Sequence, residues 1–170
     1  LRSRGLGDVY KRQIISTRES AKCRERILGL GISQISGGSK TSVGGYFNPM
    51  PENENSAQFD VSDRRPLDEV IKWLMQLGYL PSFCTACYGS GRTGDRFMEV
   101  CKNQQIHNFC HPNAILTLKE YLEDYASADT AEIGEKLIAR ELANIPNKKA
   151  RTLSAEYIES IHGGERDFRF

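Results

Sequence analysis

Three cysteines in the chain have the spacing of a metal site. Cys84 and Cys87 form a Cys-x2-Cys pair, and Cys110 completes a Cys-x2-Cys-x22-Cys pattern. Two thiolates at the shorter spacing can bind one metal centre from a single turn of backbone, and a third from a distant segment closes the site. The pattern therefore predicts a metal centre held by Cys84, Cys87 and Cys110.

The spacing does not fix which metal is bound. A cuboidal four-iron cluster has four iron corners, so three thiolates would leave one iron open to substrate, product or an additional metal. A structural zinc would use the same cysteines with His107 or His111 as the fourth ligand. A redox pair fits less well, because the Cys-x2-Cys does not open an evident helix after a strand. Iron–sulfur and zinc stay equally open on spacing alone.

The neighbours of the cysteines favour an anionic centre. Cys110 lies two residues before Pro112, which is expected to open a helix. The N-terminus of that helix would offer N–H groups and partial positive charge to a negatively charged cluster. Arg92 and Arg96 are near in sequence and would add charge of the same sign.

The elements that must position these residues follow from the hydrophobic pattern. β-branched runs at 14–16 and 32–36 flank an expected helix over 18–30, which predicts two parallel strands joined by a helix. Amphipathic patterns then predict helices over 67–77, 95–102, 112–125, 130–145 and 154–161, the last capped by Ser154. A small α/β part is thus followed by a mainly helical one.

Composition places the chain among globular proteins. It has 170 residues, of which 39% are hydrophobic and 26% charged. We expect a cytoplasmic protein with no membrane partner, because neither a bilayer-spanning apolar run nor a secretion signal is evident. Five cysteines then remain reduced. Cys23 and Cys101 fall within helical patterns and are interpreted as ordinary small residues.

Residues 1–13 look unlike the rest, and their tail resembles a translated sequencing adapter. We interpret them as a non-native leader and expect the native protein to continue upstream of Ile14. The leader holds four basic residues and one acidic residue, so removing it from the 23 basic and 22 acidic residues of the chain leaves 19 and 21. The net charge changes from +1 to −2, and no basic field remains to indicate a nucleic acid partner.

Several stretches resemble the HydG family of radical SAM tyrosine lyases, which mature [FeFe] hydrogenase. The resemblance spans essentially Ile14 to Phe170, and the stretches that carry it are Ser16–Glu19, Leu30–Ser39, Val43–Tyr46, Pro81–Tyr88, Gly91–Met98, Phe109–Ala114 and Leu118–Ala126. It implies an α/β fold in which residues 14–66 are the last strands and helices of a radical SAM (β/α)8 TIM barrel. Residues 67–170 would be a mainly helical C-terminal domain with an auxiliary iron–sulfur cluster. A biotin and thiamin synthesis-associated domain is also implied.

The resemblance implies an activity for the full-length parent. Such an enzyme cleaves SAM at a 4Fe-4S cluster held by Cys-x3-Cys-x2-Cys, splits tyrosine into p-cresol and dehydroglycine, and forms CO and cyanide on iron for the hydrogenase H-cluster. Tyrosine, SAM and other hydrogenase maturation proteins are the implied partners. The 170 residues contain no Cys-x3-Cys-x2-Cys, so we expect SAM and its cluster to bind a missing N-terminal part and the chain alone to be inactive.

Particular residues acquire roles through the same resemblance. Cys84, Cys87 and Cys110 match the ligands of the auxiliary 4Fe-4S cluster, which can carry an additional iron. Arg18 is a candidate for binding an amino acid carboxylate, although a salt bridge at a helix start would explain it as well. The last candidates, for a SAM or tyrosine pocket, are Ser36, Gly37 and Ser39, where simple turn chemistry is the competing explanation.

Two other functions remain as alternatives. One is a non-catalytic interaction module stapled by zinc at the cysteines. The other is a fragment of the related 2-iminoacetate synthase of thiamine (thiazole) biosynthesis, which is disfavoured because that family lacks the third-cysteine motif.

Overall fold

The structure is a computed structural model that describes residues 14–47, 57–103 and 105–170. The leader 1–13 and the side chain of His107 lie outside the described residues. The chain divides into two compact units, residues 1–70 and 71–170, and each is described by itself.

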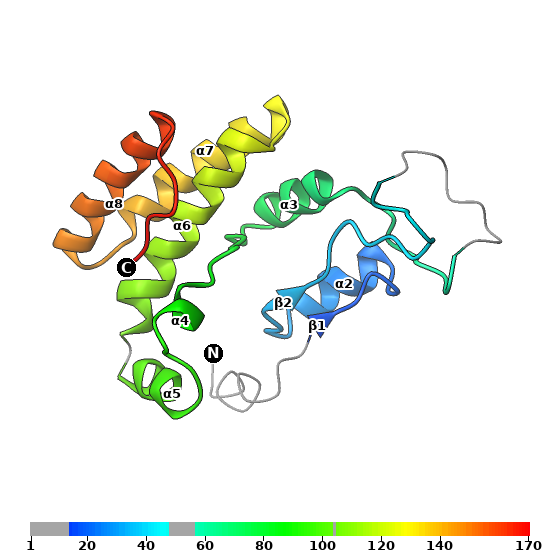
Figure 1. Cartoon of the computed structure of the whole chain (residues 1–170), viewed down its shortest axis with the longest axis horizontal. Helices are drawn as coiled ribbons and strands as arrows, with labels where there is room; N and C mark the ends of the chain where they lie inside the picture. The colour runs from blue at the N-terminus through cyan, green and yellow to red at the C-terminus, as the bar shows by residue number, and fades with distance from the viewer. Residues whose placement is uncertain (1–13, 48–56, 104) are drawn as a thin grey trace. The chain divides into compact units, whose positions relative to one another are not determined.

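The first unit is built on a strand, a helix and a second strand (Figure 1). β1 (Ile14–Ile15) pairs in parallel with β2 (Gln34–Ile35), with Ile15 opposite Ile35, and α2 (Ala21–Leu28) connects them. The predicted parallel strand–helix–strand unit is confirmed. The described sheet has these two strands, so no closed barrel is formed within the described chain.

The helix α2 begins three residues later than predicted. Ser20 is extended, and its Oγ accepts a hydrogen bond from the backbone N–H of Cys23 at 3.3 Å. This is the usual way in which serine satisfies a free N–H at a helix start. Arg18 therefore lies in the turn between β1 and α2 rather than in the helix.

A buried arginine ties this unit together. Arg24 is fully buried and donates hydrogen bonds to the carboxylate of Asp63 and to the carbonyl oxygen of Ser36. Arg65 also donates to Asp63, at 2.6 and 2.8 Å. These contacts join α2 to the end of β2 and to the segment before α3 (Leu67–Gln76).

The second unit centres on three long helices packed against one another, α6 (Ile106–Asp124), α7 (Ala128–Ala143) and α8 (Lys148–His162) (Figure 1). Their apolar side chains share one core, which Ile71 and Met75 of α3 complete. Ile115, at the centre of α6, is fully buried. The prediction of a mainly helical second part is confirmed.

Two short helices precede the three long ones in the sequence. α5 (Asp95–Lys102) has the predicted bounds. α4 (Ala86–Gly89) is a single turn that contains the second cysteine of the Cys-x2-Cys pair, and it was not predicted as a helix.

The predicted start of α6 at Pro112 was wrong. The helix begins at Ile106, and Pro112 lies inside it, fully buried. Proline usually occupies the first turn because it lacks an N–H, and that preference led to the wrong prediction. Within the helix it leaves the carbonyl of Asn108 without the donor that an ordinary residue at 112 would supply.

The predicted cap of the last helix was also wrong. α8 begins at Lys148, and the Oδ1 of Asn147 accepts from the N–H groups of Lys149 (3.0 Å) and Ala150 (3.2 Å). Ser154 is buried within the helix, where its Oγ donates to the carbonyl oxygen of Ala150 at 2.7 Å. The first turn of α8 is polar, so the apolar pattern alone did not reveal it.

After α8 the chain turns back along the helices (Figure 1). Arg166 donates to both carboxylate oxygens of Asp124 on α6, at 2.6 and 3.0 Å. The backbone N–H of Asp167 donates to the Oε1 of Glu120 at 2.8 Å. Residues 165–170, here called the return segment, are thereby fixed on α6.

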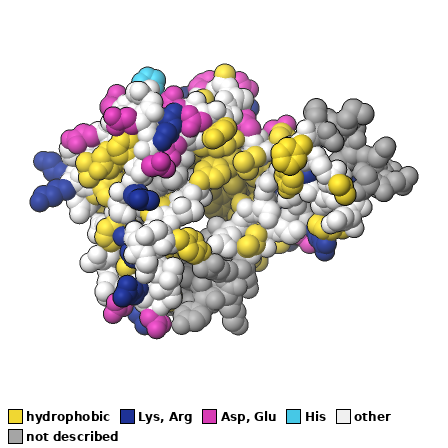
Figure 2. Space-filling model, in the orientation of Figure 1, with side chains coloured by type: hydrophobic (Ala, Val, Ile, Leu, Met, Phe, Trp, Pro, Cys, Tyr) yellow, Lys and Arg dark blue, Asp and Glu magenta, His cyan; other side chains and the backbone are white. Residues whose placement is uncertain are grey.

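Charges of both signs are interspersed on the face drawn in Figure 2. Lys119 is buried and ion-paired with Glu123 and Glu135, whereas the Lys136–Glu132 pair is exposed. Among the described residues, none of the helices has the length and hydropathy that crossing a bilayer requires.

Candidate metal centre

The Cys-x2-Cys pair lies around the single turn of α4. Cys84 precedes the turn and Cys87 lies within it, and both are half-buried. The backbone N–H of Ala86 donates to the Sγ of Cys84 at 3.4 Å, an interaction that would stabilise a thiolate. The N–H of Phe83 donates to the Oγ1 of Thr117 at 3.2 Å, which attaches this segment to α6.

The third cysteine lies on α6. Cys110 is the fifth residue of that helix and is half-buried. The prediction that it precedes a helix N-terminus is therefore wrong. Cys110 lies beyond the first turn of α6, so the free N–H groups of that turn do not belong to its neighbours in the way that the sequence indicated. Positive charge that stabilises a cluster must therefore come from other groups.

The three predicted thiols lie close enough to interact electrostatically. Burial first, and then the nearby thiols of Cys87 and Cys84, together raise the pKa of Cys110 to about 11. Arg92 opposes this rise. Residues more than 20 positions apart in sequence thus share one electrostatic environment, as a common ligand set requires.

One further cysteine enters this environment. Cys101, on α5, raises the pKa of Cys110, and its own pKa is raised by burial and then by Cys87. The sequence interpretation of Cys101 as an ordinary residue did not anticipate this placement. Its position between the second and third predicted ligands was the only signal available.

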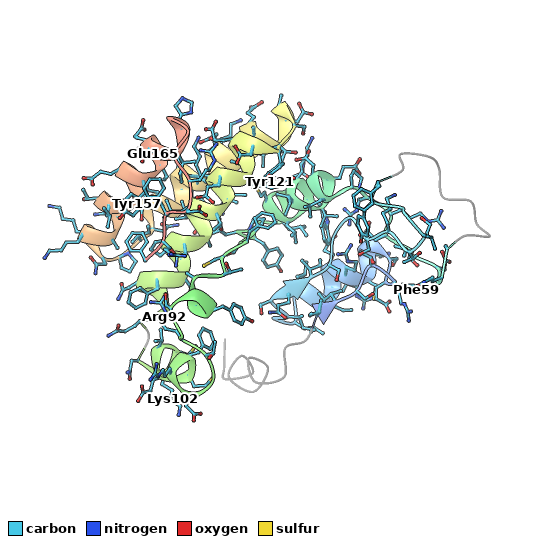
Figure 3. The ribbon with its side chains drawn as sticks, in the orientation of Figure 1. Phe59, Arg92, Lys102, Tyr121, Tyr157 and Glu165 are labelled. Atoms are coloured by element: carbon cyan, nitrogen blue, oxygen red, sulfur yellow. The ribbon has the colours of Figure 1, made fainter. Side chains whose placement is uncertain are left out.

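Arg92 connects several parts of the site. Its backbone N–H donates to the carbonyl oxygen of Cys87 at 2.8 Å. Its guanidinium lies over the ring of Phe109, with 5.1 Å from Cζ to the centroid. The residue that follows Phe109 is Cys110, so the arginine lies beside both halves of the cysteine pattern. Figure 3 labels Arg92 near α4. For Arg96 the structure gives an exposed position on α5.

His111 has a different partner. Its Nε2 lies 3.0 Å from the Oε2 of Glu141 on α7. The ring is thereby engaged with a carboxylate of a neighbouring helix. In residues 14–47, 57–103 and 105–170, no three His, Cys, Asp or Glu side chains form a ready-made site for one metal ion.

The candidate substrate residues lie where the two parallel strands end. Arg18 is exposed, and its guanidinium lies over the ring of Phe59, with 4.1 Å from Cζ to the centroid. Phe59 is labelled in Figure 3. Ser36 continues the strand pairing, with its N–H donating to the carbonyl oxygen of Ile15 at 2.9 Å. The segments that follow β1 and β2 therefore share one edge of the sheet, the edge at which α/β proteins bind ligands.

Gly37 and Ser39 follow on the same segment, and both are half-buried. A Cβ on Gly37 would lie 3.1 Å from the Cδ1 of Leu67 and 3.4 Å from the Cγ1 of Val70. The absence of a side chain at 37 thus serves close packing on α3.

The donor set suits an iron–sulfur cluster chemically. Three thiols influence one another electrostatically, a backbone N–H donates to the sulfur of Cys84, and the guanidinium of Arg92 lies over the ring of Phe109, next to Cys110. Thiolates are the ligands that such clusters prefer, and positive groups compensate the negative charge of the cluster.

Comparison with known proteins adds three findings. The Biotin and Thiamin Synthesis associated domain matches residues 9–80. The 2-iminoacetate synthase of Escherichia coli (strain K12) is 46% identical over 52 residues, which are 31% of this chain and 13% of that protein. A crystal structure of HydG, described as a maturase of the [FeFe]-hydrogenase, superposes with a TM-score of 0.84 at 52% identity. That match covers 92% of this chain and 33% of the HydG chain.

Proposed function

We propose that this chain, which is a HydG-like C-terminal segment, binds an auxiliary 4Fe-4S cluster through Cys84, Cys87 and Cys110. The proposal rests on the electrostatic interaction of these three thiols, the N–H that donates to the sulfur of Cys84, and the guanidinium that lies next to Cys110. When bound, the cluster would present an iron corner without a protein ligand, where small ligands or an additional iron can bind. The chain spans one third of the HydG chain that it matches, so the proposal concerns one part of a larger enzyme.

The residues of the chain itself have three tasks at this site. The turn of α4 orients Cys84 and Cys87, and α6 supplies Cys110. The N–H of Ala86 stabilises the sulfur of Cys84. Arg92 contributes positive charge where three thiols must lose their protons on binding metal.

For the parent enzyme we propose the radical SAM tyrosine lyase activity. It would split tyrosine into p-cresol and dehydroglycine and form CO and cyanide on iron for the hydrogenase H-cluster. SAM would bind with a second 4Fe-4S cluster outside these 170 residues, and other hydrogenase maturation proteins would receive the product. The 52% identity over nearly the whole chain supports this assignment. Arg18, Ser36 and Ser39, at the ligand-binding edge of the parallel pair, are the proposed substrate contacts.

Anaerobic reconstitution of the reduced chain with ferrous iron and sulfide tests the cluster. We expect broad visible absorbance and an EPR signal on reduction, both lost in Cys84→Ala and Cys110→Ala. Cys23→Ala is the matched control and retains both, because Cys23 lies in the first unit, on α2. Stoichiometric zinc without the chromophore would instead support the zinc-stapled interaction module.

An activity assay tests whether the chain alone can cleave tyrosine. With SAM, tyrosine and a reductant, the chain alone is expected to produce no p-cresol, because it contains no Cys-x3-Cys-x2-Cys motif. Production of p-cresol by the 170 residues would refute this part of the proposal.

The match to 2-iminoacetate synthase favours a second candidate, a segment of a thiazole-pathway enzyme. The two candidates differ at the cysteines, since only the first uses Cys84, Cys87 and Cys110. A chain that folds but takes up no iron in the reconstitution would favour the second.

A further inference from the structure

We propose that Arg92 is a positioning residue that ties the Cys84–Cys87 turn to the part of α6 that carries Cys110, through the backbone of Phe170. Its effect on a bound cluster rests on the proposed function. Its effect on the placement of the thiols does not, and can be measured in the metal-free chain.

Arg92 contacts three segments at once. Its backbone N–H is bonded to Cys87, and its Nη2 donates to the carbonyl oxygen of Phe170 at 3.0 Å. Its guanidinium also lies over Phe109, next to Cys110. A single residue therefore links the three segments, through its backbone to the α4 turn and through its side chain to the return segment and α6.

Asn113 completes the link on α6. It is 2% exposed and lies one helical turn after Phe109. The Oδ1 of Asn113 accepts from the N–H of Phe170 at 2.8 Å, and its Nδ2 donates to the carbonyl oxygen of Phe170 at 3.4 Å. Arg92 and Asn113 thus share one carbonyl oxygen as acceptor.

The anchor that they share is itself held firmly. Phe168 stacks on Tyr157 of α8 with centroids 4.4 Å apart, and Phe170 meets the same ring edge-on at 5.9 Å. Arg166 and Asp167 fix the start of the return segment on α6. Tyr157 is labelled in Figure 3. The main-chain oxygen of Phe170 that accepts the hydrogen bond from Arg92 is therefore held in place by these contacts.

The burial of one guanidinium nitrogen of the partly buried Arg92 argues that this position is specific. Its Nε is buried and has no hydrogen-bond partner among the described residues. Burying a guanidinium with an unsatisfied donor is costly unless its remaining contacts compensate. The compensating contacts are those with Phe170 and Phe109, and they hold the charge next to Cys110.

Crosslinking in the reduced, metal-free chain measures the placement of the thiols. Dibromobimane fluoresces when it joins two neighbouring thiols, and peptide mapping identifies the Cys87–Cys110 product. Arg92→Gln is expected to slow this product about tenfold, equivalent to about 1.4 kcal/mol. Arg92→Lys, which keeps a charged donor, recovers part of the rate. Arg96→Gln, on the exposed side of the neighbouring helix, is the matched control and leaves the rate unchanged.

Far-UV circular dichroism separates positioning from unfolding. If Arg92→Gln keeps its helix content and crosslinks at the original rate, the proposal is wrong. If Arg92→Gln loses helix content, Asn113→Ala is the variant that tests the proposal. It removes the two hydrogen bonds between Asn113 and Phe170 and leaves Arg92 unchanged. A slower Cys87–Cys110 product in folded Asn113→Ala supports the link, and an unchanged rate overturns it.

Spectroscopy extends the test to the reconstituted chain. Arg92→Gln is expected to change the EPR line shape of the reduced cluster and to lower the iron content, with Arg96→Gln unchanged. A chain that binds no iron at all would refute the proposed function. A crosslinking difference would then still establish the role of Arg92 in the metal-free protein.

Discussion

The buried charges of Arg24 and Asp63 show how single residues set the pH response of the first unit. Hydrogen bonds from Arg65, opposed by burial and helped by Arg24, lower the pKa of Asp63 from 3.8 to about 2. A carboxylate with a lowered pKa stabilises the folded state above its unfolded pKa. That contribution, about 2 kcal/mol, is lost as the pH falls from about 4 through about 2.

Asp63→Asn should therefore unfold more easily at neutral pH. Removing the carboxylate leaves Arg24 buried without its charged partner, which typically costs about 3 kcal/mol or more. Urea unfolding at pH 7 measures this loss, and a series down to pH 2 should show a shallower acid dependence in the variant.

Asp60→Asn is the matched control for that experiment. Asp60 pairs with Arg64 at 3.3 Å, and both side chains are exposed. Exposed pairs contribute little, so a change within about 0.5 kcal/mol is expected. An equal loss in both variants would contradict the role assigned to the buried pair.

At this scale, sequence spacing revealed the residues that act through local chemistry. Cys84 and Cys87 are recognisable in the sequence because two thiols at that spacing usually bind a metal or form a redox pair. Asn113 and Phe170 do not, because their pairing joins positions 57 residues apart. No local pattern predicts that a carbonyl at 170 is shared by Arg92 and Asn113.

Close packing of two helices depends on one glycine. Gly134 is buried in the middle of α7, and a Cβ there would lie 2.4 Å from the Cδ1 of Leu122 on α6. Glycine within a helix normally costs about 1 kcal/mol relative to alanine. Its presence indicates that the contact with α6 outweighs this cost.

Gly134→Ala should lower the free energy of unfolding by about 1–2 kcal/mol despite its better helix propensity. Leu122→Val in the same chain should recover part of that loss, because it removes volume at the point of contact. A double-mutant cycle by chemical denaturation measures the coupling. A stabilising Gly134→Ala would show that Leu122 moves aside freely.

Helices and strands were predictable where their ends carry the residues that usually begin or end such elements. The bounds of α5 were predicted correctly, and α2 and β2 were placed in the right order. The starts of α6 and α8 were missed for opposite reasons. A proline that normally opens a helix lies inside one, and the asparagine cap precedes a polar turn that gives no hydrophobic period.

At the scale of the whole chain, the candidate centre belongs to one unit. Cys84, Cys87, Cys110 and the return segment all lie within residues 71–170, and the core of the long helices is drawn from the same range. α3 supplies two members of that core, so a self-sufficient piece must include the whole helix.

Residues 66–170 are accordingly expected to fold without the strand–helix–strand part and to take up as much iron per chain as the full 170 residues. Circular dichroism and iron analysis after reconstitution measure both. Arg92→Gln within this piece should reproduce its effect in the full chain. A folded piece that takes up no iron, beside a full chain that does, would contradict the assignment of the centre to this unit.

Pro112 divides α6 into two stretches that differ in how readily they open. The turns before it, which carry Cys110, lack one main-chain bond to the rest of the helix. The turns after it contain the fully buried Ile115 and Leu118. Amide protons of 106–111 should therefore exchange with solvent by local fraying, and those of 115–124 by global opening. The third thiol would then be able to admit or release a metal while the long helices stay folded.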